Sequence, residues 1–165
     1  MTSKTGGPAA GLPFLLTTLE EFRRSPKRGG PYHAGLLGAR TEALGAAGCV
    51  GERLVAINEA LVMAANDDIR ISVPALQRVK GDLLRLECGS DTSVEGLFWQ
   101  AIELVRQQGA LSFELRVSAS LARLLRDQGH SANAKALLQP VFSQFTEGFE
   151  TTDLKASKVL LDDLR

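Results

Sequence analysis

The sequence predicts an all-α protein, an α-solenoid of about three helix pairs followed by a C-terminal capping helix. From Tyr32 onward, apolar residues recur at helical spacing, and segments typical of β-hairpins do not occur. The glycines that end the first helix of each pair, Gly48, Gly89 and Gly129, are 41 and 40 residues apart. A period near 40 with two helices per unit indicates repeats that stack on one another to bury their apolar faces.

Composition narrows the function classes. The chain has 165 residues, 44% of them hydrophobic, and 19 basic residues balance 19 acidic ones. This balance gives no electrostatic reason to expect nucleic acid as a partner. The longest apolar runs fall short of the ~20 residues that a membrane helix needs, so no membrane association is expected. Two cysteines without CxxC spacing fit a reducing compartment, and we expect a cytoplasmic protein.

Residues 1–30 are predicted to be a flexible leader that contains one short helix. The segment FLLTTLEEFRR, residues 14–24, has its apolar side chains near helical spacing, and SPKRGGP, residues 25–31, supplies two prolines and two glycines that stop it. TGGPAAG, residues 5–11, is rich in glycine, but no Lys-Ser or Lys-Thr pair follows, so we interpret it as leader and not as a phosphate-binding loop.

The repeat domain is predicted to span residues 31–165. Its helix pairs are expected at residues 32–67, 70–109 and 111–149, with the capping helix at 152–164. The position twelve residues after each turn glycine holds Ala60, Ala101 or Val141, which places a similar apolar residue in each second helix. Pro140 is expected to kink or divide the last of these helices, because it removes a backbone hydrogen bond and its ring clashes with the preceding turn.

The positions of the individual helices follow from apolar stripes and breakers. The first pair is predicted at 33–47 and 51–65. In the second pair, Leu76, Val79, Leu83 and Leu86 form the stripe of the first helix, and the apolar face of its partner ends before Gly109. The third pair is predicted from about Ser112 to Gln128 and, with Ser131 as N-cap, from there through Phe145. In the capping helix, the buried face comprises Leu154, Ser157, Leu161 and Leu164.

The repeat segments resemble a known family. Ala110–Leu164, with SLARLLRDQG followed by FTEGFETTDLK, is similar to the C-terminal tetratricopeptide-like (TPR) tail of large bacterial signalling ATPases. RISVPALQRVKGDLLRL at Arg70–Leu86 and GERLVAINEAL at Gly51–Leu61 resemble the preceding repeats of that tail, so the likeness covers about Tyr32–Arg165. The resemblance implies a TPR-like fold.

In that family the tail follows a nucleotide-binding ATPase module headed by a nucleotide cyclase or a winged-helix DNA-binding domain. The chain has no GxxxxGK[ST] phosphate loop, and a cyclase or DNA-binding segment would not fit before Tyr32. The resemblance therefore implies only a scaffold role. We expect a detached tail, either a small gene product that stands alone or a fragment of a larger ATPase.

No catalytic, cofactor-binding or metal-binding residue is predicted, and we do not expect an enzyme. His33 and His130 are isolated from further ligands at zinc-site spacing. Asp127, His130 and Ser131 could be assembled into a triad on paper, but neither a nucleophile elbow nor an oxyanion loop accompanies them. We interpret these three residues as a turn between helices.

The candidate binding site is a basic stripe on the first helices of the second and third pairs, made of Arg78, Arg85, Arg116, Arg123 and Arg126. Arg85 and Arg126 occupy matching positions one repeat apart. Guanidinium groups in a row can hold the carboxylates of an acidic peptide through bidentate hydrogen bonds. The alternative interpretation is an ordinary solvated helix face.

The sequence thus favours a non-catalytic scaffold that binds a protein or peptide, or a second copy of itself. A homodimer would use the uncovered apolar face near Leu36, Leu37 and Leu44, unless the helix at 14–24 covers it. The alternative is a regulatory subunit or detached tail of an ATPase-linked cyclase or transcriptional-regulator system. An enzyme is the third reading, and a deep closed pocket with convergent titratable groups would support it.

Overall fold

The computed structural model describes residues 50–66, 72–88 and 92–164. Within these ranges the secondary structure is helical, with no strand. The predicted helices at 14–24 and 33–47, the leader, and the proposed dimer face at Leu36, Leu37 and Leu44 lie outside the described residues. The six described helices are, in chain order, α3 (Val50–Asn66), α4 (Val73–Cys88), α5 (Thr92–Gln107), α6 (Leu111–Asp127), α7 (Ser131–Phe142) and α8 (Thr152–Asp163).

The described helices belong to two compact units that divide within α4, between Leu83 and Leu84. In the first unit, α3 packs against the first part of α4. Ile57, Ala60 and Ala64 of α3 and Leu76, Val79 and Leu83 of α4 form its buried apolar cluster. The second unit contains the end of α4 and helices α5 to α8.

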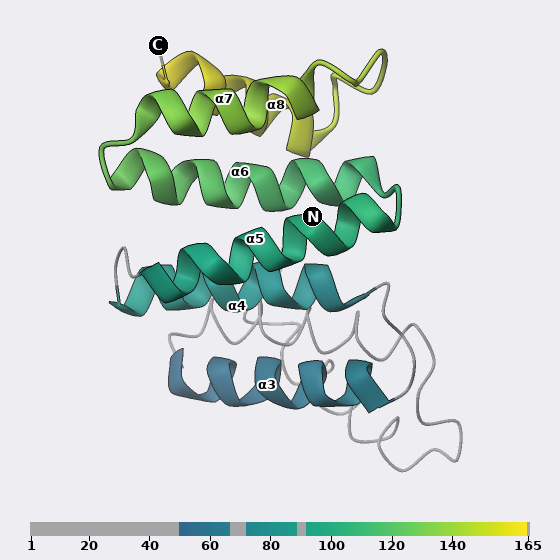
Figure 1. Ribbon diagram of the computed structural model, residues 1–165, viewed down its shortest axis with the longest axis vertical. Helices are drawn as coiled ribbons and strands as arrows, with labels where there is room; N and C mark the ends of the chain where they lie inside the picture. The colour runs from purple at the N-terminus through teal and green to yellow at the C-terminus, as the bar shows by residue number, and fades with distance from the viewer. Residues whose placement is uncertain (1–49, 67–71, 89–91, 165) are drawn as a thin grey trace, which may run out of the picture. The chain divides into compact units, whose positions relative to one another are not determined.

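In the second unit, α6 is the central helix. It packs against α5 on one side and against α7 and α8 on the other (Figure 1). Nine of its seventeen residues are buried, among them Leu121, Ala122 and Leu124, which are fully enclosed. Small residues such as Ser118 and Ala119 on this helix allow its neighbours to approach closely.

Two turns of the same form connect α5 to α6 and α6 to α7. In each, a glycine in the left-handed region follows the helix: φ is 64° at Gly109 and 83° at Gly129. The amide of the residue after each glycine donates to a carbonyl five residues back, from Ala110 to Val105 and from His130 to Leu125. These are Schellman motifs, and glycine suits them because it has no Cβ to oppose a positive φ.

The buried residues support the predicted repeat register. Ala60, Ala101 and Val141, the residues twelve positions after the turn glycines, are all buried. The predicted buried face of the last helix is also confirmed, since Leu154, Ser157, Leu161 and Leu164 are enclosed together with Leu160.

Three local predictions are wrong. Leu86 is 67% exposed, since ten residues of helix rotate it away from the face of Leu76, and Leu84 packs against the core of the second unit instead. The N-cap of α7 is His130, without a side-chain capping bond, and Ser131 is the first helical residue. Helix α7 ends at Phe142 and not at Phe145, and two i to i+3 hydrogen bonds, from Gln144 to Val141 and from Phe145 to Phe142, follow its end. Pro140 lies inside this helix and does not divide it.

Candidate functional site

Helices α6 and α8 run in the same direction and are joined by two matching ion pairs. Near their N-termini, Arg116 Nε donates to Asp153 Oδ2 at 2.6 Å. Near their C-termini, Arg126 Nη1 lies 3.9 Å from Asp163 Oδ2. In both pairs the two residues are 37 positions apart, so one constant register relates the helices along their length. The arginines of α6 are therefore aligned with the carboxylates of α8.

Asp127, the last residue of α6, is shared by two of the predicted arginines. Arg85 Nη1 of α4 donates to Asp127 Oδ2 at 2.7 Å, and Arg126 Nη2 donates to Asp127 Oδ1 at 3.2 Å. Arg85 and Arg126, the positions that the sequence matches one repeat apart, thus meet at one carboxylate. Together with Asp163, these residues form a chain of charges across α4, α6 and α8.

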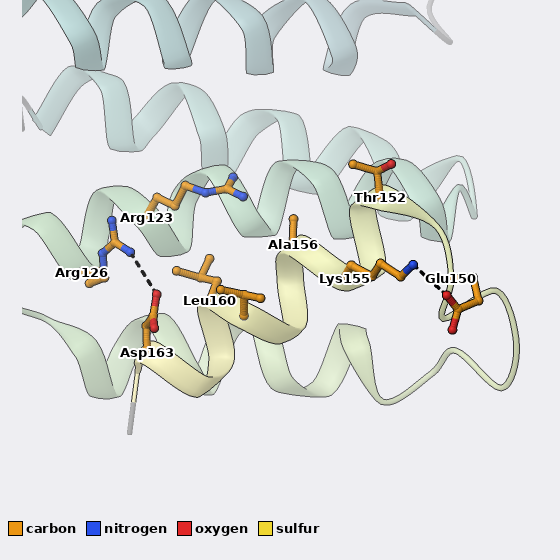
Figure 2. Close-up of a pocket in the computed structure, with 9 residues that line it drawn as sticks. Arg123, Arg126, Glu150, Thr152, Lys155, Ala156, Leu160 and Asp163 are labelled. Atoms are coloured by element: carbon orange, nitrogen blue, oxygen red, sulfur yellow. Dashed lines mark ion pairs between the residues drawn. The ribbon is translucent and has the colours of Figure 1, made fainter.

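An open groove of about 520 Å³ lies between the second half of α6 and the exposed side of α8 (Figure 2). Arg123 and Arg126 of α6 form one wall. The other residues come from α8 and the loop before it, and they are Glu150, Thr152, Lys155, Ala156, Val159, Leu160 and Asp163.

Charges sit at both ends of the groove and apolar side chains between them. In Figure 2 the Arg126–Asp163 contact marks one end and the Lys155–Glu150 pair, 2.7 Å long, marks the other, with Ala156 and Leu160 in between. The side chains of Lys155 and Asp163 are each 58% exposed. Such a groove can hold an apolar side chain while its ends bind charged groups.

The five predicted arginines have different surroundings. Arg123 and Arg126 line the groove, whereas Arg85 and Arg116 belong to the same compact unit but lie outside the groove lining. Arg116 also has its guanidinium carbon 5.5 Å from the ring centroid of Phe113, a cation–π contact. Arg78 belongs to the other unit and pairs with Asp82 at 2.8 Å within α4.

The acidic partners of the arginines and the part of the groove that α8 provides do not follow from the sequence patterns above. From the sequence, Lys155 and Asp163 are only polar positions outside the apolar face of the capping helix. A signal was present, because the spacing of 37 between each arginine and its carboxylate is close to the repeat period. Extending the repeat alignment to the last helix would have placed α8 beside α6.

Asp127 and His130, two of the residues considered above for a catalytic triad, have structural roles at the turn between α6 and α7. Both carboxylate oxygens of Asp127 accept hydrogen bonds from arginines, and His130 is the exposed N-cap of α7. Among the described residues, no group of three or more His, Cys, Asp or Glu could hold a metal ion. In the same part of the chain, every helix is too short or too polar to span a bilayer.

Comparison with known proteins identifies the fold. Neither a protein-family model nor a curated protein matches the sequence. Two crystal structures of TPR-like repeats from a Podosopora anserina protein described as a kinesin light chain match 98% of this chain at 17% identity. They superpose with TM-scores of 0.71 and 0.70 and are covered over 78% and 79% of their length. The chain has an all-α, TPR-like solenoid fold.

Proposed function

We propose that the protein is a non-catalytic helical repeat scaffold, and that the groove between α6 and α8 binds an acidic segment of a partner protein or peptide. The observation that carries this proposal is the groove itself, where the cations Arg123, Arg126 and Lys155 line the same hollow as apolar side chains of α8, and where two exposed carboxylates, Glu150 and Asp163, lie beside them. Arginine suits such a role, because its planar guanidinium can hold a carboxylate through two parallel hydrogen bonds.

The ion pairs already in the groove favour exchange with a partner. Exposed pairs of this kind contribute only about 0.2–1 kcal/mol each. The contact between Arg126 and Asp163 is also long, at 3.9 Å. A partner carboxylate can therefore replace Asp163 beside Arg126 at small cost, and burial of an apolar partner side chain against Ala156 and Leu160 adds a favourable term.

The open form of the groove also favours binding over catalysis. A catalytic site usually encloses its titratable groups and excludes water around them. Here Lys155 and Arg126 lie at an accessible surface and are engaged by neighbouring carboxylates. This arrangement suits recognition of a protein surface.

Capture of partners by the immobilised full chain tests the proposal. We expect the Arg123→Glu/Arg126→Glu variant to lose at least one partner that the wild type retains, because two cations of the groove become anions. The wider Arg78→Glu/Arg85→Glu/Arg123→Glu/Arg126→Glu variant tests the whole predicted stripe. Identical sets of captured partners for the wild type and both variants would contradict the proposal.

The control needs the same change of charge elsewhere. Lys135 on α7 and Lys158 on α8 are exposed and lie outside the groove lining. The Lys135→Glu/Lys158→Glu variant should keep the wild-type partners. Thermal unfolding followed by circular dichroism shows whether each variant is folded before capture is compared.

A second candidate function rests on the sequence resemblance of Ala110–Leu164 to the tails of bacterial signalling ATPases. In this proposal the chain is a cytoplasmic regulatory subunit or detached tail that acts on a cyclase-ATPase or winged-helix ATPase. Co-purification of such an ATPase with the full chain would support it, and partners that all lack a nucleotide-binding module would count against it.

A further inference from the structure

One stripe on the exposed side of α8 has complementary charges at its two ends. Lys155, Val159 and Asp163 follow one another at intervals of four residues, so they lie along one side of the helix. Each is about three-fifths exposed, and all three line the groove. The stripe thus presents a cation, an apolar side chain and an anion over about 12 Å of helix.

We infer that a second copy of this chain docks on this stripe, with α8 packed antiparallel against α8 of the other copy. This inference rests on the proposed function in one respect, that the groove is a protein-binding surface.

The stripe is complementary to itself when a second copy is turned to run in the opposite direction. In a two-fold interface, if residue i contacts residue j of the other copy, then j also contacts i. Val159 is halfway between Lys155 and Asp163. An antiparallel pair centred on Val159 therefore places Lys155 opposite the other copy's Asp163, twice, and brings the two Val159 side chains together. A parallel arrangement in register would instead place like charges opposite each other.

The groove supplies the space that such packing needs. Ala156, one turn before Val159, has a short exposed side chain, and the hollow beside it is bounded by Leu160 and by Arg123 of α6. The Val159 side chain of the other copy can enter this hollow, as ridges enter grooves in helix packing. Two Val159 side chains, each 61% exposed in the single chain, would then leave water.

The interface is small, so the association is weak. Contact between one helix and one groove buries less than the roughly 1,200 Å² typical of stable complexes. We therefore expect a dimer that forms at high protein concentration and dissociates on dilution. In the dimer, the groove that we propose for an acidic partner is occupied, so partner and second copy compete.

Analytical ultracentrifugation of the purified full chain, with variants that reverse the charge of Lys155 or Asp163, tests the inference. The wild-type mass should rise with concentration from 17.7 kDa toward twice that value. Lys155→Glu and Asp163→Lys each place like charges at both symmetry-related contacts, and each should weaken association about tenfold or more. A mixture of the two variants should associate, because both contacts between unlike variants again join opposite charges.

Two further variants complete the design. Val159→Asp, at an exposed position that leaves the fold intact, should abolish the dimer, whereas Lys135→Glu on α7 should leave it unchanged. A monomeric wild type at every concentration would overturn the inference, as would a mixture of the two charge variants that stays monomeric. Because this experiment contains no other protein, such a result would leave the partner-capture test of the scaffold proposal standing.

Discussion

At Asp127 a carboxylate lies at the C-terminal end of α6, where the helix dipole disfavours negative charge. Two guanidinium groups compensate: Arg85 and Arg126 each donate to one of its oxygens. Arg85 comes from α4, so this contact also fixes α6 against the end of α4 in the same compact unit. The residue thus holds an interhelical contact at a position where an acid alone would be unfavourable.

We expect Asp127→Asn to lower the free energy of unfolding by about 1 kcal/mol, because it removes the negative charge from three hydrogen bonds with Arg85 and Arg126 and replaces one acceptor oxygen by an amide donor. Urea unfolding at low and high salt checks this, since added salt screens the wild-type contacts and should shrink the difference between the two proteins. Glu147→Gln, in the exposed loop between α7 and α8, is the matched control and should be neutral. An Asp127→Asn effect that is absent at low salt would contradict this role.

The charged residues of the groove also show how much of the site the sequence predicts. The arginines could be found, because their spacing places them on first helices of adjacent repeats. Their acidic partners could not be found from helix patterns alone, because Asp153 and Asp163 meet α6 only through the packing of α8. Whether a charged side chain is free or paired depends on such contacts between helices that are distant in sequence.

At the scale of the helices, the turns at Gly109 and Gly129 determine how the chain reverses around α6. Each turn has a short link and the same pair of backbone hydrogen bonds, so α5, α6 and α7 are neighbours by local geometry. Sequence patterns predicted these turns because glycine after a helix has a known physical role. The exposure of Leu86 and the place of Ser131 as first helical residue do not follow from the sequence. Residue spacing does not show where a long apolar stripe rotates out of the buried face, nor which residue is the first of a helix.

A pair of glycine substitutions tests the turn geometry. At Gly129, where φ is 83°, an added Cβ would meet no neighbouring atom, so the cost of Gly129→Ala is backbone strain alone. We expect it to destabilise the protein by about 1 kcal/mol. Gly96, inside α5, is the control: its added Cβ also meets nothing, and Gly96→Ala should stabilise the helix by about 0.5–1 kcal/mol. Chemical unfolding measures both, and equal effects of the same sign would contradict the account.

At the scale of the whole molecule, the repeat period was enough to predict the fold class. The period near 40 and the small residues at matching positions reflect a physical requirement, since each helix pair must bury an apolar face against the next. The TPR-like neighbours share this fold at 17% identity, so the architecture is kept although most of the residues differ. A partner cannot be predicted in the same way, because it depends on a few exposed side chains that the fold does not constrain.

The central claim is that the groove between α6 and α8 is a protein-binding surface, and site-specific photo-crosslinking at position 159 tests it most directly. A photoreactive residue in place of Val159 should give a crosslinked protein adduct in cells, and Arg123→Glu/Arg126→Glu in the same chain should abolish or strongly reduce it. The same photoreactive residue in place of the exposed Lys135 should give no such adduct. The absence of any adduct from position 159, or equal adducts from positions 159 and 135, would contradict the claim.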